Sequence, residues 1–191
     1  VMEGLNQFVD AQAEAGVKII YLHARKAWLN GLSPKENREV PPLDYGRAGQ
    51  LATDYPDLDI ILNGGLETFE DIQSATEAGL FCGVMIGRAA YKTPRQLGYI
   101  SSALFGHEMA DLSHIAQQMS DYAEKEIEKG VRLHNITRHM LGLFTGLKGA
   151  RTWRRTLGEQ ARDNPTAAAL IAQTAQTCLA LQDENSNRKV A

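Results

Sequence analysis

Three short apolar runs, separated by helical patterns, constrain the fold of this chain more than any other feature. The runs are residues 17–22, 58–62 and 83–86. Runs of this length and character are typical of buried strands, and Gly or Pro residues lie near their ends. Strands that alternate with helices indicate a parallel α/β sheet. We expect the first run, which is apolar apart from Lys18, to be buried on both faces of the sheet.

Helical patterns accompany these strands. Apolar residues recur at helical spacing in residues 3–15, 44–53 and 68–78, and a short helix is expected from Ala89. Residues 24–43 form a long loop after the first strand, and loops of this length inside compact domains are usually functional or disordered.

No strand candidate remains after Met109. The helices expected there cover residues 108–128, 131–144, 150–161 and 165–182. Short connections between helices are typical of an antiparallel bundle. We therefore predict two domains, an α/β domain over residues 1–103 and an all-α domain over residues 104–191.

The Lys and Arg residues are unevenly distributed. The net charge is only −3, but residues 129–155 contain seven Lys or Arg and no Asp or Glu. A block of one sign suggests a polyanionic partner such as a nucleic acid, and a solvated surface is the alternative. Trp153 lies within this block. Its ring either stacks on a base or fills the core of the helical domain, and we favour the core.

Each of the three strands ends on residues suited to binding an anion. His23 ends the first, Asn63-Gly64-Gly65 follows the second, and Gly87-Arg88 follows the third. The carboxyl ends of parallel strands meet at one edge of a sheet, so we expect these residues on the same side. Glycine lets backbone N–H groups approach an anion closely, and Arg adds a fork of donors. Tight turns are the alternative explanation for each glycine pair.

Other site classes are not apparent in the sequence. Cys82 and Cys178 have neither metal-ligand nor redox spacing, and we expect both to be buried in a protein of a reducing compartment. No metal-binding set is visible, and no apolar run is long enough to span a membrane.

Several motifs together closely resemble the tRNA-dihydrouridine synthase family. They occupy residues 23–29, 31–39, 41–45, 63–65, 83–91 and 149–155, so the resemblance extends over nearly the whole chain. The loop motif GLSPKENRE is the most specific of them. The Asn-Gly-Gly or Gly-Arg motif alone would be weak evidence for the family.

The resemblance implies both a fold and an activity. The family fold is an FMN-binding, TIM-type (β/α)8 barrel followed by a helical bundle that binds tRNA. This chain would contribute the last three barrel strands and the bundle. Enzymes of this family use FMN, reduced by NADPH, to convert uridine in the tRNA D-loop to 5,6-dihydrouridine, and the subfamily resemblance implies uridines 20 and 20a.

The matched motifs also imply roles for individual residues. The residues that resemble ligands of the FMN phosphate are His23, Asn63, Gly64, Gly65, Gly87 and Arg88. The residues that resemble tRNA contacts are Lys35, Arg38, Arg151 and Arg154.

The chain also departs from the family pattern. The N-terminal part of the family's proteins, which includes their proton-donor cysteine, has no counterpart in this sequence. We therefore expect no catalytic residue in this chain and interpret it as the C-terminal part of a longer protein. Three parallel strands cannot close a barrel, so we expect an exposed sheet edge, an exposed apolar face and no uridine reduction by these residues alone. The protein is expected to be a cytoplasmic monomer.

Two other functions are compatible with the same residues. One is a catalytically inactive tRNA-binding module that lacks flavin. The other is a different phosphate-binding barrel enzyme acting on a small metabolite, which would leave the basic helical block unexplained.

Overall fold

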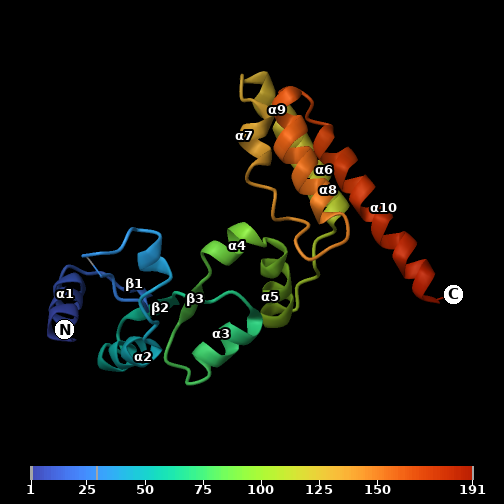
Figure 1. The fold of residues 1–191 in the computed structure, drawn as a ribbon. Coiled ribbons are helices and arrows are strands. Elements are labelled where there is room, and N and C mark those ends of the chain that lie inside the picture. Colours follow the sequence, from blue (N-terminus) through green and yellow to red (C-terminus); the bar gives the residue numbers. More distant parts are fainter. Residues whose placement is uncertain (1, 29, 191) are drawn as a thin grey trace. The chain divides into compact units, whose positions relative to one another are not determined.

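The computed structural model describes the backbone of residues 2–28 and 30–190, and the side chains of residues 4–28 and 30–182. The chain divides into two compact units, a strand-containing unit (Val1–Arg88) and a helical unit (Ala89–Ala191). Figure 1 shows the elements of each unit. The division places residues 89–103 with the helices, whereas the sequence interpretation grouped them with the sheet.

The strand-containing unit is built on a three-stranded parallel sheet. Strands β1 (Ile19–His23), β2 (Asp59–Asn63) and β3 (Gly83–Met85) pair in the order β1-β2-β3. The predicted alternation is confirmed, because helices α1 (Met2–Glu14), α2 (Tyr45–Asp54) and α3 (Phe69–Thr76) flank the strands in the chain.

Side-chain caps begin two of these helices. The Asp44 carboxylate accepts a hydrogen bond from the Arg47 N–H at the start of α2 (2.9 Å). A capping box formed by Thr68 and Asp71 begins α3. Each cap satisfies N–H groups that have no partner within the helix, so the polar residue before each apolar pattern sets where the helix begins.

Only one face of the sheet is covered. Ile60 and Leu62 are 1% and 0% exposed, and the core on the Ile60 side includes side chains from α1 and α2. On the opposite face Ile19 and Tyr21 are 54% and 65% exposed. The prediction that the first strand is buried on both faces was therefore wrong, since helices pack on one side only. The expected exposed apolar face is confirmed.

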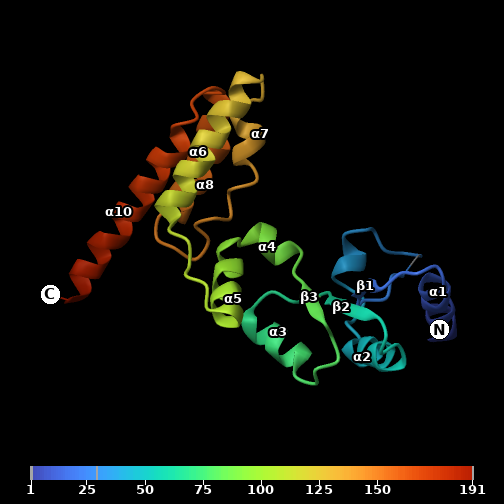
Figure 2. The same ribbon diagram turned by 180° about the vertical axis from the view of Figure 1, so that it is seen from behind.

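The helical unit contains these elements: α4 (Arg88–Lys92), α5 (Arg95–Phe105), α6 (Leu112–Glu128), α7 (Leu133–Thr137), α8 (Ala150–Arg155), η2 (Thr156–Gln160), α9 (Ala161–Asp163) and α10 (Leu170–Val190). Helix α10 packs against α6 and α8, as both views show (Figures 1 and 2). No helix within residues 2–28 and 30–190 combines the length and the apolar character needed to cross a membrane.

The helical unit differs from the sequence expectation in two places. Helix α5 was not predicted separately. It begins after Pro94 and ends at Gly106, whose φ of 68° is left-handed. The helix expected over residues 131–144 is only the short α7 followed by turns. Gly142 lies within these turns, where an added Cβ would overlap the backbone oxygen of Lys92, so only glycine allows the chain to pack so closely.

Candidate functional site

The carboxyl ends of the three strands form one edge of the sheet. His23 lies opposite Asn63, and Asn63 lies opposite Met85, two residues before Gly87. The Ala24 N–H donates to the Asn63 carbonyl (2.8 Å), which continues the pairing past the end of β1. The sequence prediction that these three strand ends meet on one side is therefore confirmed.

The glycine pair after β2 forms a cradle that no other residue would fit. Gly64 and Gly65 have φ values of 118° and 71°, which L side chains rarely adopt. A Cβ on Gly64 would lie 3.1 Å from His23 Cε1, so the imidazole ring packs directly against this backbone. A Cβ on Gly65 would overlap the side chain of Leu43. Gly87 differs, since its Cβ would meet only open space.

Tyr45 supports this cradle from α2, and sequence reasoning did not single it out for this role. Its hydroxyl donates to the Gly64 carbonyl (2.7 Å). Burial, followed by the nearby Asp71 carboxylate, raises the pKa of Tyr45, so its hydroxyl keeps its proton and remains a donor at neutral pH.

His23 is held in its neutral form. Its Nδ1 accepts a hydrogen bond from the backbone N–H of Arg25 (3.1 Å), which places the ring proton on Nε2. Burial lowers the pKa of His23, and the positive charges of Arg25 and Arg88 lower it further. A neutral imidazole at this position offers one N–H donor, and a bound anion would counteract the two arginines that disfavour its protonation.

The lowered pKa of His23 predicts a pH dependence of stability. Between this lowered pKa and the ordinary value of 6.5 the unfolded chain binds more protons than the folded chain. The contribution of His23 is therefore complete above pH 6.5 and is lost as the pH falls through this window. We expect denaturant unfolding of the natural protein and of His23→Gln to diverge between about pH 7.5 and about pH 5.5, with the natural protein losing more stability. An NMR titration giving His23 a pKa above 6.5 would contradict the expectation.

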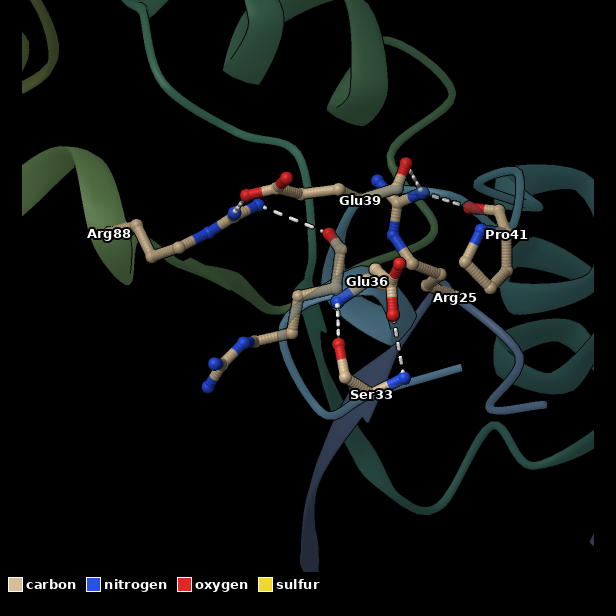
Figure 3. Close-up of polar contacts among 7 residues, drawn as sticks. Arg25, Ser33, Glu36, Glu39, Pro41 and Arg88 are labelled. Carbon is tan, nitrogen blue, oxygen red and sulfur yellow. Dashed lines mark hydrogen bonds and ion pairs between the residues drawn. The ribbon is translucent and has the colours of Figure 1, made fainter. Parts of the chain in front are cut away.

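Two arginines tie the long loop to the strand ends (Figure 3). The Arg25 guanidinium donates to the Glu39 carbonyl (3.1 Å) and to the Pro41 carbonyl. The Arg88 guanidinium pairs with the Glu39 carboxylate (3.1 Å) and donates to the Arg38 carbonyl (3.2 Å). The loop after β1 is therefore held by Arg25, two residues past the end of β1, and by Arg88, which follows β3.

The ion pair of Arg88 bears on its predicted role as a phosphate ligand. The side chains of Arg88 and Glu39 are 42% and 52% exposed. An ion pair this exposed contributes little to stability, so an anion with more charge than a carboxylate could replace Glu39. The role itself stays a prediction.

Lys35 and Arg38 lie on the same loop. Both are exposed, with Lys35 immediately before the short η1 helix (Glu36–Arg38) and Arg38 at its end. Ser33 fixes the start of this turn, because its N–H donates to the Glu36 carboxylate (2.8 Å) and its hydroxyl accepts from the Glu36 N–H (3.3 Å) (Figure 3). The Ser33 hydroxyl, followed by the Ser33 N–H, lowers the pKa of Glu36.

The basic block of the helical unit is a mixture of surface and core. Arg151 and Arg154 are exposed on α8. Trp153 is 0% exposed, its Nε1–H donates to the Met140 carbonyl (2.8 Å), and its ring lies 4.6 Å from that of Phe144. The core interpretation of Trp153 is confirmed, and its ring cannot reach a nucleic acid base.

The two cysteines have different environments. Cys178 is buried, as predicted, but Cys82 is exposed. The Cys82 thiol lies 3.2 Å from the Asp59 carboxylate, and this hydrogen bond, more than any other cause, raises the pKa of Cys82. The expectation of burial failed for Cys82 because β3 begins after it and nothing packs over its side chain.

The structure combines a parallel α/β sheet, whose carboxyl edge carries His23 and the glycine pair, with a second, helical unit that has exposed arginines on α8. A family model described as dihydrouridine synthase (Dus) matches residues 2–180. The chain belongs to the dihydrouridine synthase family, which confirms the resemblance seen in its motifs.

Curated relatives agree with this assignment. The chain is 45% identical over 185 residues to the tRNA-dihydrouridine(20/20a) synthase of Shewanella oneidensis, which covers 94% of this chain and 55% of the relative. It is 48% identical to the protein of the same name from Pasteurella multocida, over 83% of this chain and 49% of the relative. It is 44% identical to the protein of the same name from Vibrio cholerae, over 90% of this chain and 53% of the relative. The chain thus spans about half the length of the curated relatives it matches.

Proposed function

We propose that the natural protein reduces uridine to 5,6-dihydrouridine in the tRNA D-loop, at positions 20 and 20a, with FMN as cofactor and NADPH as reductant. The names of the relatives support the reaction and the positions. The observation that carries the proposal is the glycine cradle beside His23, at the carboxyl edge of a parallel sheet. A phosphate group fits such an edge, where bare backbone and cationic side chains converge.

The residues present suit the phosphate of FMN. Gly64 and Gly65 have left-handed φ values and carry no side chain that could cover their own backbone N–H groups, which is the condition for close approach of an anion to the backbone. His23 and Leu43 pack where their Cβ atoms would lie and hold the turn in place. The proposed ligands are His23, Asn63, Gly64, Gly65, Gly87 and Arg88. A bound flavin would supply the reducing equivalents for the uracil ring.

The chain's own side chains would bind and orient rather than exchange protons with the uracil. Neutral His23 would donate its Nε2–H, and Arg88 would exchange Glu39 for the phosphate. Neither cysteine is a suitable proton donor to a substrate, because the Cys82 thiol donates its hydrogen bond to the Asp59 carboxylate and Cys178 is buried. We therefore assign no catalytic residue to this chain.

We assign the tRNA contacts to Lys35, Arg38, Arg151 and Arg154. All four are exposed cations. Residues 1–103 would form the FMN-binding part of a TIM-type barrel and residues 104–191 the tRNA-binding domain, in a cytoplasmic monomer. The exposed apolar face of β1 supports this proposal, since a barrel has an apolar interior to which such a face would contribute.

A flavin-free tRNA-binding module is the second candidate, and the exposed arginines of α8 would suit it equally. Flavin absorbance of the purified natural protein separates the two. We expect a yellow protein that releases FMN on denaturation, and an Arg88→Ala variant that retains at most about a tenth of the flavin, since a lost charge-assisted bond is worth about 1.5–3 kcal/mol. Arg95→Ala, which removes an arginine from α5, is the control and should remain yellow. A colourless natural protein that still binds tRNA would favour the module.

A further inference from the structure

An apolar hollow of about 390 Å³ opens on the surface of the helical unit. Its walls include Ile115, Met119 and Leu143. Three side chains that can form hydrogen bonds also line it: Tyr122, Asn135 and His139. Tyr122 is 50% exposed. Within the part of the chain whose side chains are described, the Asn135 amide and the Tyr122 hydroxyl have no hydrogen-bond partner.

A cationic hollow of about 270 Å³ adjoins the apolar one. His139 lines both, and its Nδ1 lies 2.9 Å from the Tyr91 hydroxyl. The cationic hollow is also lined by Lys92, Arg138 and Arg154, and no carboxylate lies in its wall. Among the described side chains none forms an ion pair with these three cations, in contrast to Arg88.

A second cationic hollow, of about 490 Å³, continues from the first. The two share Arg138, and the second adds His134 and Arg162, again with no acid in the lining. Buried Nδ1 of His134 has no hydrogen-bond partner. Arg154, Arg138 and Arg162 therefore form a line of positive charge that runs from the hollow next to the apolar one into the second cationic hollow.

We propose that these hollows bind one unstacked nucleotide of the RNA substrate, with its base in the apolar hollow and its flanking phosphates along the cationic line. An amide beside an exposed aromatic ring suits a splayed-out base, because the ring stacks on the base face and the amide offers both a donor and an acceptor to the base edge. Unpaired arginines beside it suit the phosphates that such a base carries. The inference rests on the proposed function, and it assigns RNA contacts to Tyr122, Asn135, Arg138 and Arg162.

Affinity of the natural full-length protein for an unmodified tRNA transcript, measured against salt concentration, tests the proposal. We expect Tyr122→Ser to weaken binding about tenfold with an unchanged salt slope, and Tyr122→Phe to restore it, since stacking needs the ring and not the hydroxyl. Arg138→Ala should weaken binding and reduce the slope by about 0.9. The matched controls are Tyr99→Ser and Arg95→Ala on α5, outside these hollows, and they should bind as the natural protein does.

A fluorescent base analogue gives a second readout, and its first part needs only the natural protein. Placed in turn at each unpaired position of the D-loop, the analogue should be quenched at one position by the natural protein and less so by Tyr122→Ser. Unchanged affinity of Tyr122→Ser and Arg138→Ala, alongside weakened binding by Arg151→Ala, whose residue lines none of these hollows, would overturn the nucleotide site and leave the proposed function standing. Failure of the natural protein to bind tRNA at all would instead overturn both.

Discussion

Replacing Trp153 by alanine is expected to lower the free energy of unfolding of the helical unit by about 3–5 kcal/mol. The indole is fully buried, contacts Phe144, and donates its N–H to the Met140 carbonyl. Truncation removes the ring, leaves a cavity and takes away one of the two hydrogen bonds that the Met140 carbonyl accepts, the other being from the Leu143 N–H (3.0 Å). The surrounding helices can close only part of the space.

Two variants separate these contributions to the stability of the helical unit. Trp153→Phe keeps most of the ring but loses the hydrogen bond, so we expect a smaller loss of about 1–3 kcal/mol. Arg155→Ala, at an exposed position of the same helix, should change stability by less than about 0.5 kcal/mol. Denaturant unfolding followed by far-UV circular dichroism measures all three. A stable Trp153→Ala that had lost only its tRNA affinity would return Trp153 to a base-stacking role.

Replacing Arg151 and Arg154 together by alanine is expected to weaken tRNA binding on the order of 50-fold at about 0.1 M salt. Each arginine that neutralises a phosphate contributes about 0.9 to the slope of log affinity against log salt concentration. Loss of two contacts should therefore reduce the slope by about 1.8, and the difference between the proteins should shrink as salt rises. Both side chains are exposed on α8, so the variant should keep its fold.

The matched control for this variant removes the same charge from another surface. Lys125 and Lys129 lie at the end of α6, where Glu126 pairs with Lys129 (2.7 Å). Lys125→Ala/Lys129→Ala should therefore bind tRNA with nearly the natural slope. Equal slopes for the natural protein and the arginine variant would remove Arg151 and Arg154 from the interface.

The sequence predicts the strands and their ends well because both depend on local patterns. The apolar runs, the glycines after β2 and the caps of α2 and α3 all act within a few residues. The exposure of Ile19 and Tyr21 could not be predicted in this way, because the composition of a strand does not reveal whether helices pack on one face of the sheet or on both. Only one short helix was expected from Ala89, whereas the structure has α4 and then α5, which begins after Pro94, a residue that is well tolerated where a helix begins.

The site was predicted in outline but not in its contacts. His23, the glycine pair and Arg88 follow from strand ends in a parallel sheet. Their neighbours depend on contacts between residues far apart in the chain. Arg25 reaches carbonyl groups 14 and 16 residues away, and Arg88 reaches a carboxylate 49 residues away. No spacing rule links such residues, so the three-dimensional arrangement of the loop was needed to find them.

The most direct test of the account is the product that the natural full-length protein forms on tRNA. Unmodified tRNA is incubated with the FMN-loaded protein and NADPH, and nucleosides at each D-loop position are analysed by mass spectrometry. We predict a gain of two hydrogens at uridines 20 and 20a, and none when these 191 residues alone replace the full-length protein. A full-length protein that binds tRNA and FMN but adds no hydrogen to any uridine would contradict the account.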